Sequence, residues 1–203
     1  MRKMLFLFAI AILVVAVNGC AKPPQMDIDA AKAALDGARS AEAGTYAEDS
    51  LRSAEDAMAQ LDQELKVQEE KFALFRSYKK ATELAGGAKA AGEKAASDAK
   101  AGKAQKKAEA EAAMVEVKTL LDTTKAALDA APKGKGTQAD LAAMKADLDG
   151  AAAVIGEAES AFNAEKYIDA KAKVDGAKQT IASVNSAIEA AKAAKAAAKG
   201  GRR

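Results

Sequence analysis

Few side chains in this sequence are of the types that carry out chemistry. The 203 residues include one cysteine and no histidine, which removes the commonest general base and the commonest metal ligand. A single cysteine also excludes disulfides within the chain and cysteine-cluster zinc sites. The segment Gly134-Lys135-Gly136-Thr137 lacks the earlier glycine, the Lys-Ser/Thr pair and the preceding strand of a phosphate-binding loop. We therefore expect neither an enzyme nor a bound metal or cofactor.

Acidic pairs are the remaining candidates for general acid–base work. Glu69-Glu70 and the pair Glu109/Glu111 lie on segments with helical patterning. Without an apolar pocket nothing raises a carboxyl pKa toward neutrality, so we expect these groups to be solvated charges.

The lone cysteine follows a segment typical of protein targeting. Met1 to Met4 is short and basic, and Leu5 to Val17 is an uninterrupted apolar run of 13 residues. That length is short for a membrane span and fits the core of a signal peptide. An ordinary secretory signal followed by an incidental cysteine is the alternative.

Val17-Asn18-Gly19-Cys20 resembles a bacterial lipobox, with an unusual asparagine at its most tolerant position. The resemblance implies a diacylglyceryl group on the Cys20 thiol, cleavage between Gly19 and Cys20, and acylation of the new amine. Ala21 follows the cysteine; by resemblance to enterobacterial sorting rules this implies the outer membrane. Several acyl chains anchor a protein stably without a transmembrane helix.

The composition indicates an all-α protein. The chain has 56 alanines, no tryptophan and only 4% aromatic residues, a composition that favours helix over sheet. Loss of Arg2 and Lys3 with the signal peptide leaves 29 basic and 29 acidic residues. Five cations without an acid lie in residues 190–203: Lys192, Lys195, Lys199, Arg202 and Arg203.

Large apolar residues recur every seven positions along three segments. Such heptads form a narrow seam that another helix must cover, and they predict an elongated helical hairpin or antiparallel coiled-coil bundle. The residues expected in helix interfaces are Leu51, Met58, Leu61, Leu65, Phe72, Phe75, Leu121, Leu128, Leu141, Leu148, Ile155, Phe162, Tyr167, Val174, Ile181 and Ile188. Phe72, Phe75 and Tyr78 follow one helix face, so we expect core packing rather than an aromatic binding patch.

The seam disappears between residues 86 and 113, which contain no Leu, Ile, Val, Met or aromatic residue. We expect a solvent-exposed helical spacer here, or a frayed one, with a break at Gly86-Gly87. Pro132 to Gly136 predicts a loop, with Thr137 capping the next helix. The expected organisation is a signal peptide 1–19, a lipidated tether 20–26, a helical hairpin 27–85, the spacer 86–113, coiled-coil helices 114–189 and a basic tail 190–203.

The segment Ala41-Glu42-Ala43-Gly44-Thr45-Tyr46-Ala47-Glu48 recurs weakly, because Ala158-Glu159 and Ala164-Glu165 repeat its two Ala-Glu pairs. Either an ancestral duplication or chance matches in a biased composition would explain this weak repeat. With the lipobox, the segment resembles an uncharacterised family of bacterial envelope lipoproteins that has an Ala-rich helical hairpin and a Tyr-Ala-Pro-like turn. The resemblance covers residues 20–90, with Glu48 where proline is common. Asn163 to Tyr167 loosely resembles a tetratricopeptide-type turn.

These observations predict a non-enzymatic lipoprotein of the outer membrane that faces the periplasm and acts as a scaffold or adaptor. Its expected partners are the membrane, through the lipid, and another protein or a second copy, through helix faces. The basic tail is either a solubilising helix end or a contact with anionic lipid or cell wall; we expect no nucleic acid. The alternative function is a stress or desiccation protectant that folds on membranes.

Overall fold

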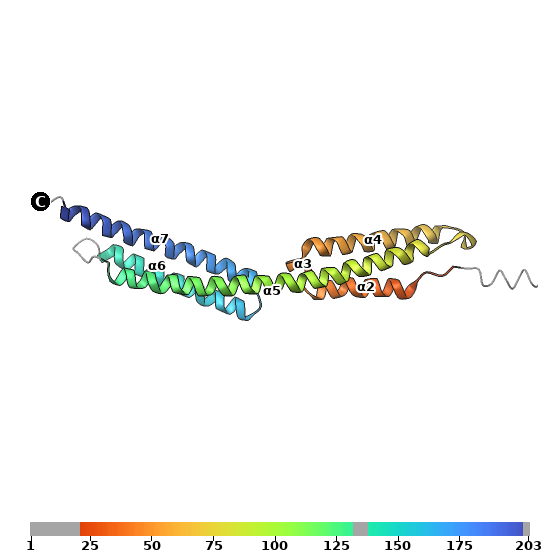
Figure 1. The fold of residues 1–203 in the computed structure, drawn as a ribbon, viewed down its shortest axis with the longest axis horizontal. Coiled ribbons are helices and arrows are strands. Elements are labelled where there is room, and N and C mark those ends of the chain that lie inside the picture. Colours follow the sequence, from red (N-terminus) through yellow and green to blue (C-terminus); the bar gives the residue numbers. More distant parts are fainter. Residues whose placement is uncertain (1–20, 132–137, 201–203) are drawn as a thin grey trace, which may run out of the picture. The chain divides into compact units, whose positions relative to one another are not determined.

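The computed structural model describes residues 21–131 and 138–200, and every regular element among them is a helix (Figure 1). The α-helices are α2 (Gln25–Ser40), α3 (Ala43–Tyr46), α4 (Glu48–Glu70), α5 (Lys79–Asp129), α6 (Gln138–Asn163) and α7 (Tyr167–Gly200), and a single 3-10 turn, η1, covers Ala73–Phe75. The predicted all-α bundle is confirmed.

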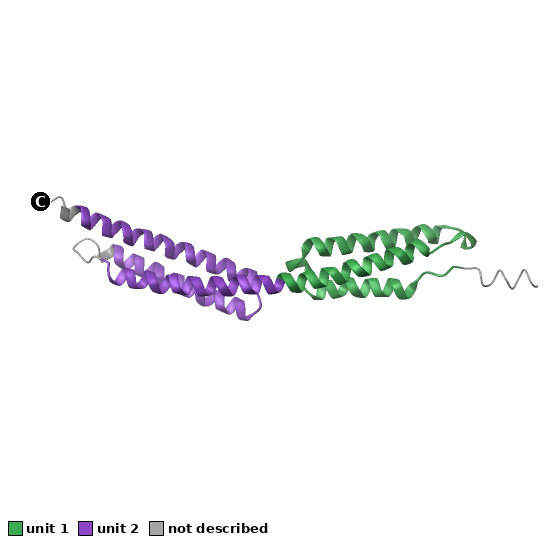
Figure 2. Cartoon of the chain, viewed as in Figure 1, with its two compact units in different colours: residues 1–102 green, residues 103–203 purple. Residues whose placement is uncertain are grey.

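The chain divides into two compact units, residues 1–102 and 103–203 (Figure 2). The division falls inside α5, whose 51 residues continue through it. Each unit is therefore built from one part of α5 together with helices of its own.

The first unit packs α2, α4 and the first part of α5 around one core. Ion pairs fix the register: Arg39 on α2 meets Glu55 on α4 at 2.8 Å, and Lys80 on α5 meets Glu64 on α4 at 2.9 Å. α4 runs antiparallel to both α2 and the first part of α5 (Figure 1). The buried core residues include Ile28, Leu35, Met58, Leu61, Tyr78 and many alanines.

The first helix begins two residues earlier than predicted. The helical hairpin was expected from residue 27, whereas α2 begins at Gln25, directly after Pro24. Asp27 lies in the first turn, where a carboxylate still suits the positive end of the helix. The tether between Cys20 and the folded chain is accordingly two residues shorter than the predicted segment 20–26.

A glutamate in the left-handed backbone conformation turns the chain in each unit. Glu42, with φ 62°, follows α2 and precedes α3, and Glu165, with φ 60°, lies between α6 and α7. Both follow an alanine, so the structurally matching turns are Ala41-Glu42 and Ala164-Glu165. The weak repeat paired Ala41-Glu42 with Ala158-Glu159 instead, which lies inside α6.

The prediction of a solvent-exposed spacer at residues 86–113 is wrong, although the prediction that these residues are helical is confirmed. α5 runs through Gly86-Gly87 without a break, and Ala88, Ala95 and Ala99 are fully buried in the first core. A Cβ at Gly92 would lie 2.8 Å from the backbone carbonyl carbon of Ala34. Small residues on this face let α2 approach closely, so alanine and glycine serve as core residues here.

The second unit packs the rest of α5 with α6 and α7. Lys103–Glu165 and Glu116–Lys178 are ion pairs of 2.7 and 2.6 Å, and both join residues 62 apart in sequence. A constant separation means that α5 and α7 run parallel in fixed register. α6 ends at Asn163, and only residues 164–166 connect it to α7, so these two helices run antiparallel (Figure 1). The predicted loop 132–136 and the Thr137 cap lie outside the described residues.

Candidate interaction surface at the turn between α4 and α5

The sequence-predicted modification site lies outside the part of the chain that the structure describes. Gly19 and Cys20 precede the described residues, and so do the apolar run and its basic start. Of the basic tail, Lys192 and Lys195 lie on α7, where Lys192 pairs with Glu189 at 2.8 Å. The side chain of Lys199, and Arg202 and Arg203 entirely, lie outside the described part.

Most residues expected in helix interfaces do lie in the two cores. The buried ones in these cores are Met58, Leu61, Leu121, Leu128, Leu148, Ile155, Val174, Ile181 and Ile188, and Tyr167 is buried in a smaller cluster with Ala110 and Ala170. Half-buried positions that pack against these cores are Leu51, Leu65, Leu141 and Phe162. The heptad pattern therefore located both cores.

Phe72 and Phe75 are the exceptions, and their expected core role is wrong. They are 70% and 76% exposed. The reason is that α4 ends at Glu70, so the seven-residue period no longer places later residues on the seam. Phe72 instead precedes the 3-10 turn and Phe75 is its last residue, with ring centroids 6.4 Å apart, while Tyr78 is buried as expected.

We call residues 71–78 the aromatic turn, and side-chain hydrogen bonds hold it in one conformation. Arg76 donates from Nε to the backbone oxygen of Lys71 at 3.0 Å and from Nη2 to that of Glu69 at 2.9 Å. These are carbonyls at the end of α4, which lack helical partners. Arg76 therefore caps α4 and fixes the chain that leaves it.

A buried polar cluster supports the turn from beneath. Gln68, only 4% exposed, accepts a hydrogen bond from the Ser77 backbone amide at 3.0 Å and donates to Glu64 Oε1 at 2.6 Å. Lys80 completes the cluster through Glu64 Oε2. Gln68 is the polar exception within the α4 heptads, and its place in the core follows from this bond across the turn.

Charge pairing stabilises the ionised form of Glu64. The hydrogen bond from the Lys80 ammonium, followed by the one from Gln68, holds the pKa of Glu64 below its ordinary value of 4.5. Burial opposes this shift without reversing it. A carboxyl whose pKa is lowered is ionised at neutral pH, so Glu64 positions the turn rather than supplying a general acid.

The aromatic turn gathers exposed apolar side chains at one end of the first unit. Seven large hydrophobic residues are exposed within the described chain, and besides Phe72 and Phe75 they include Leu74 (62%), Met26 (87%) and Val67 (42%) at this end. We call Met26, Phe72, Leu74 and Phe75 the apolar tip. Sequence reasoning missed Met26 and Leu74, and the available signal was that Leu74 lies off the heptad between two phenylalanines.

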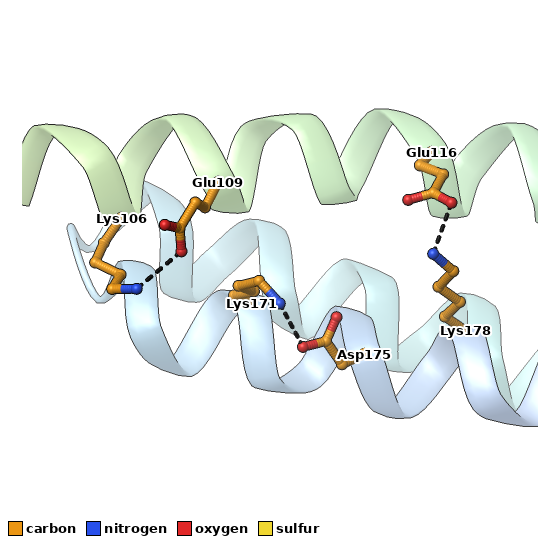
Figure 3. Close-up of polar contacts among 6 residues, drawn as sticks. All are labelled: Lys106, Glu109, Glu116, Lys171, Asp175 and Lys178. Carbon is orange, nitrogen blue, oxygen red and sulfur yellow. Dashed lines mark hydrogen bonds and ion pairs between the residues drawn. The ribbon is translucent and has the colours of Figure 1, made fainter.

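Alternating charges line α5 and α7 in the second unit (Figure 3). Glu116 meets Lys178 across the two helices, Lys106 meets Glu109 along α5, and Lys171 meets Asp175 along α7 at 2.7 Å. The hydrogen bond from Lys106 lowers the pKa of Glu109, and Asp175 raises the pKa of Lys171. Such exposed pairs each contribute little to stability and mainly favour this register.

Within residues 21–131 and 138–200, no group of three metal-ligating side chains comes together, and no helix is long and apolar enough to cross a membrane. A shallow groove of about 310 Å³ lies beside the polar cluster, lined by Gln60, Gln63, Glu64, Val67, Lys80 and Leu84.

Comparison of the chain with protein-family models, curated protein sequences and solved structures gave no match.

Proposed function

We propose that this chain is a lipoprotein, anchored in the outer membrane through Cys20, that works as a structural or adaptor protein in the periplasm. The observation that carries the proposal is the short distance from anchor to fold. α2 begins at Gln25, five residues after the only cysteine, so at most about 18 Å of extended chain joins them. Lipid on Cys20 would hold the first unit directly against a bilayer.

The two cores support a scaffold rather than a protectant that folds only on membranes. Leu61 in the first unit and Ile181 and Ile188 in the second are fully buried among residues of their own unit. Burial of such side chains stabilises a fold by about 1.5–3 kcal/mol each without any lipid. A chain with internal cores keeps its helix faces available for a partner.

The anchor is tested by Cys20→Ala in cells supplied with labelled fatty acid. We expect the wild-type chain to be cleaved and labelled, and the variant to remain an unlabelled precursor. Ala21→Asp serves as the matched sorting variant: it should keep the label and move from outer-membrane to inner-membrane fractions. Processing and labelling of Cys20→Ala at the wild-type level would refute lipidation at this residue.

The scaffold is tested with a photo-crosslinking amino acid at exposed positions of α5. Val115, 64% exposed, offers an apolar contact point, and the exposed Glu111 lies one turn away as its control. A scaffold predicts discrete adducts, concentrated at some positions and lost on heating to the unfolded state. Absence of adducts from all helix faces, together with no cooperative melting in buffer, would favour the protectant.

The basic tail is a candidate second attachment. Its cations would bind anionic vesicles or cell wall through charge, and such binding weakens steeply as salt rises. Cosedimentation with and without residues 190–203 measures this. An unchanged signal at low salt after truncation would leave the tail as a solvated helix end.

A further inference from the structure

The apolar tip and the start of the fold lie at the same end of the first unit. Arg39 on α2 contacts Glu55 on α4. The two helices run in opposite directions, and each rises about 1.5 Å per residue. Met26 lies thirteen residues before Arg39 on α2, and Gln68 lies thirteen residues after Glu55 on α4. Met26 and Gln68 are therefore at the same level along the unit. The aromatic turn begins three residues after Gln68, and Figure 1 shows the start of α2 and the α4–α5 connection at one end of the unit.

The exposed side chains at this end have the composition of a membrane-interface contact. Phenylalanine, leucine and methionine are exposed here, and Lys71, Arg76 and Lys79 lie close in sequence to the two phenylalanines and the leucine. Residues 69–80 carry four basic and two acidic side chains. Apolar groups with flanking cations bind the boundary between lipid headgroups and acyl chains.

The conformation of the aromatic turn keeps its apolar side chains available to contact a surface instead of folding into the core. Arg76, Gln68 and the Ser77 amide fix the backbone, so Phe72 and Phe75 stay outside the core. Exposed apolar groups that are held in place bind a surface without a large entropic penalty for ordering.

We propose that Met26, Phe72, Leu74 and Phe75 form a second membrane-contact site, which enters the headgroup region of the same bilayer that holds the Cys20 lipid. This inference rests on the proposed function, because the lipid brings this end of the unit to the bilayer. The occupant is a phospholipid surface, and its negative charge complements the three cations.

A tryptophan reporter tests the site, because the chain has no tryptophan of its own. Phe75→Trp places an indole at the tip, and Val115→Trp, at a 64% exposed position of the second unit, is the matched control. The protein for this experiment begins at Ala21, so it retains the described core residues, Ile28 to Ile188. Circular dichroism verifies that it is folded. Since the chain has no histidine, a hexahistidine tag before Ala21 tethers it to vesicles of phosphatidylethanolamine and phosphatidylglycerol with chelating lipid.

We expect tethering to shift the emission of Phe75→Trp to shorter wavelength and to make it quenchable by brominated acyl chains, with Val115→Trp unchanged. Phe72→Ser combined with Leu74→Ser should weaken untethered binding about tenfold or more. An indole that stays water-exposed on tethered protein overturns the inference. So does a blue shift that grows with protein concentration without vesicles, which would indicate a second copy as the occupant.

The two proposals fail separately, because the tag replaces the natural anchor. If Cys20 is not acylated in cells, the proposed function fails while the tethered measurement still reports on the tip. If Cys20 is acylated and the indole remains in water, the second contact alone is refuted.

Discussion

Gln68 and Ser77 are joined across the turn between α4 and α5: the Gln68 side-chain oxygen accepts the Ser77 backbone N–H at 3.0 Å. The amide of Gln68 also donates to Glu64, and Glu64 pairs with Lys80 on α5, so this buried cluster connects the end of α4 to the turn and to α5. The position of the exposed aromatic residues depends on this connection.

Gln68→Ala should destabilise the protein by about 1–3 kcal/mol, because it removes two hydrogen bonds from a buried group and leaves their partners unpaired. Gln63→Ala, at an exposed position of the same helix, is the control and should change the free energy of unfolding little. Urea denaturation measures both. Equal effects would mean that the bond across the turn contributes nothing.

Phe72→Ser combined with Phe75→Ser should leave the melting temperature close to that of the wild type. Both side chains are exposed, so no cavity forms when they are shortened. Leu61→Ala, at a fully buried position on the same heptads, should cost about 2–5 kcal/mol. A comparable loss of stability in the double variant would mean that the two phenylalanines are core residues, which would contradict the structure.

Two glycines of α5 should respond to alanine in opposite directions. A Cβ added at Gly87 would meet open space, so Gly87→Ala should stabilise the helix by up to about 1 kcal/mol. At Gly92 the added carbon meets the Ala34 backbone, and Gly92→Ala should destabilise by about 1–3 kcal/mol. Thermal melts of both variants check this. If both substitutions stabilised the protein, α2 would not approach α5 closely at Gly92.

Ile181→Asp should destabilise the second unit by several kcal/mol, since Ile181 is fully buried and a carboxylate there has no partner. Lys100→Asp reverses a charge at an exposed position of α5 and should have a small effect. Circular dichroism melts distinguish them, and similar losses from the two changes would contradict the assignment of the core.

Stability should fall as the pH drops below about 4.5. Ion pairs with lysines lower the pKa of Glu64, Glu157 and Glu165 from the ordinary value of 4.5. The unfolded chain then binds protons at a higher pH than the folded chain, so the contribution is complete above that value and is lost as pH falls through the lowered pKa values. Glu64→Gln should flatten the dependence of melting temperature on pH between about 5 and about 3, and an unchanged slope would exclude Glu64 as a contributor.

Sequence periodicity predicted the cores wherever large side chains mark them. In α6 and α7 the seven-residue spacing of Leu148, Ile155, Val174 and Ile181 corresponds to buried positions, because both helices continue without interruption past them. The pattern carries this information since one face of each helix is covered along its length.

Periodicity failed where the reason for burial or exposure lies in another segment. No glycine or proline marks the end of α4 at Glu70, and Arg76, six residues later, caps its carbonyls. In α5 the buried residues of the first core are mostly alanines, whose burial depends on how closely α2 approaches at Gly92. A search for large apolar residues cannot detect a close interface made by small ones.

The continuity of α5 has a consequence for the order of folding events. Starting a helix is slow and unfavourable, whereas adding residues to an existing helix is easy. α5 passes from Gly102 to Lys103 without interruption, so whichever unit folds first leaves a helix end from which the other unit's portion grows. Whichever unit folds later therefore needs one helix nucleation step fewer. Although each core is made of its own unit's residues, folding of one unit accelerates folding of the other through the shared helix α5.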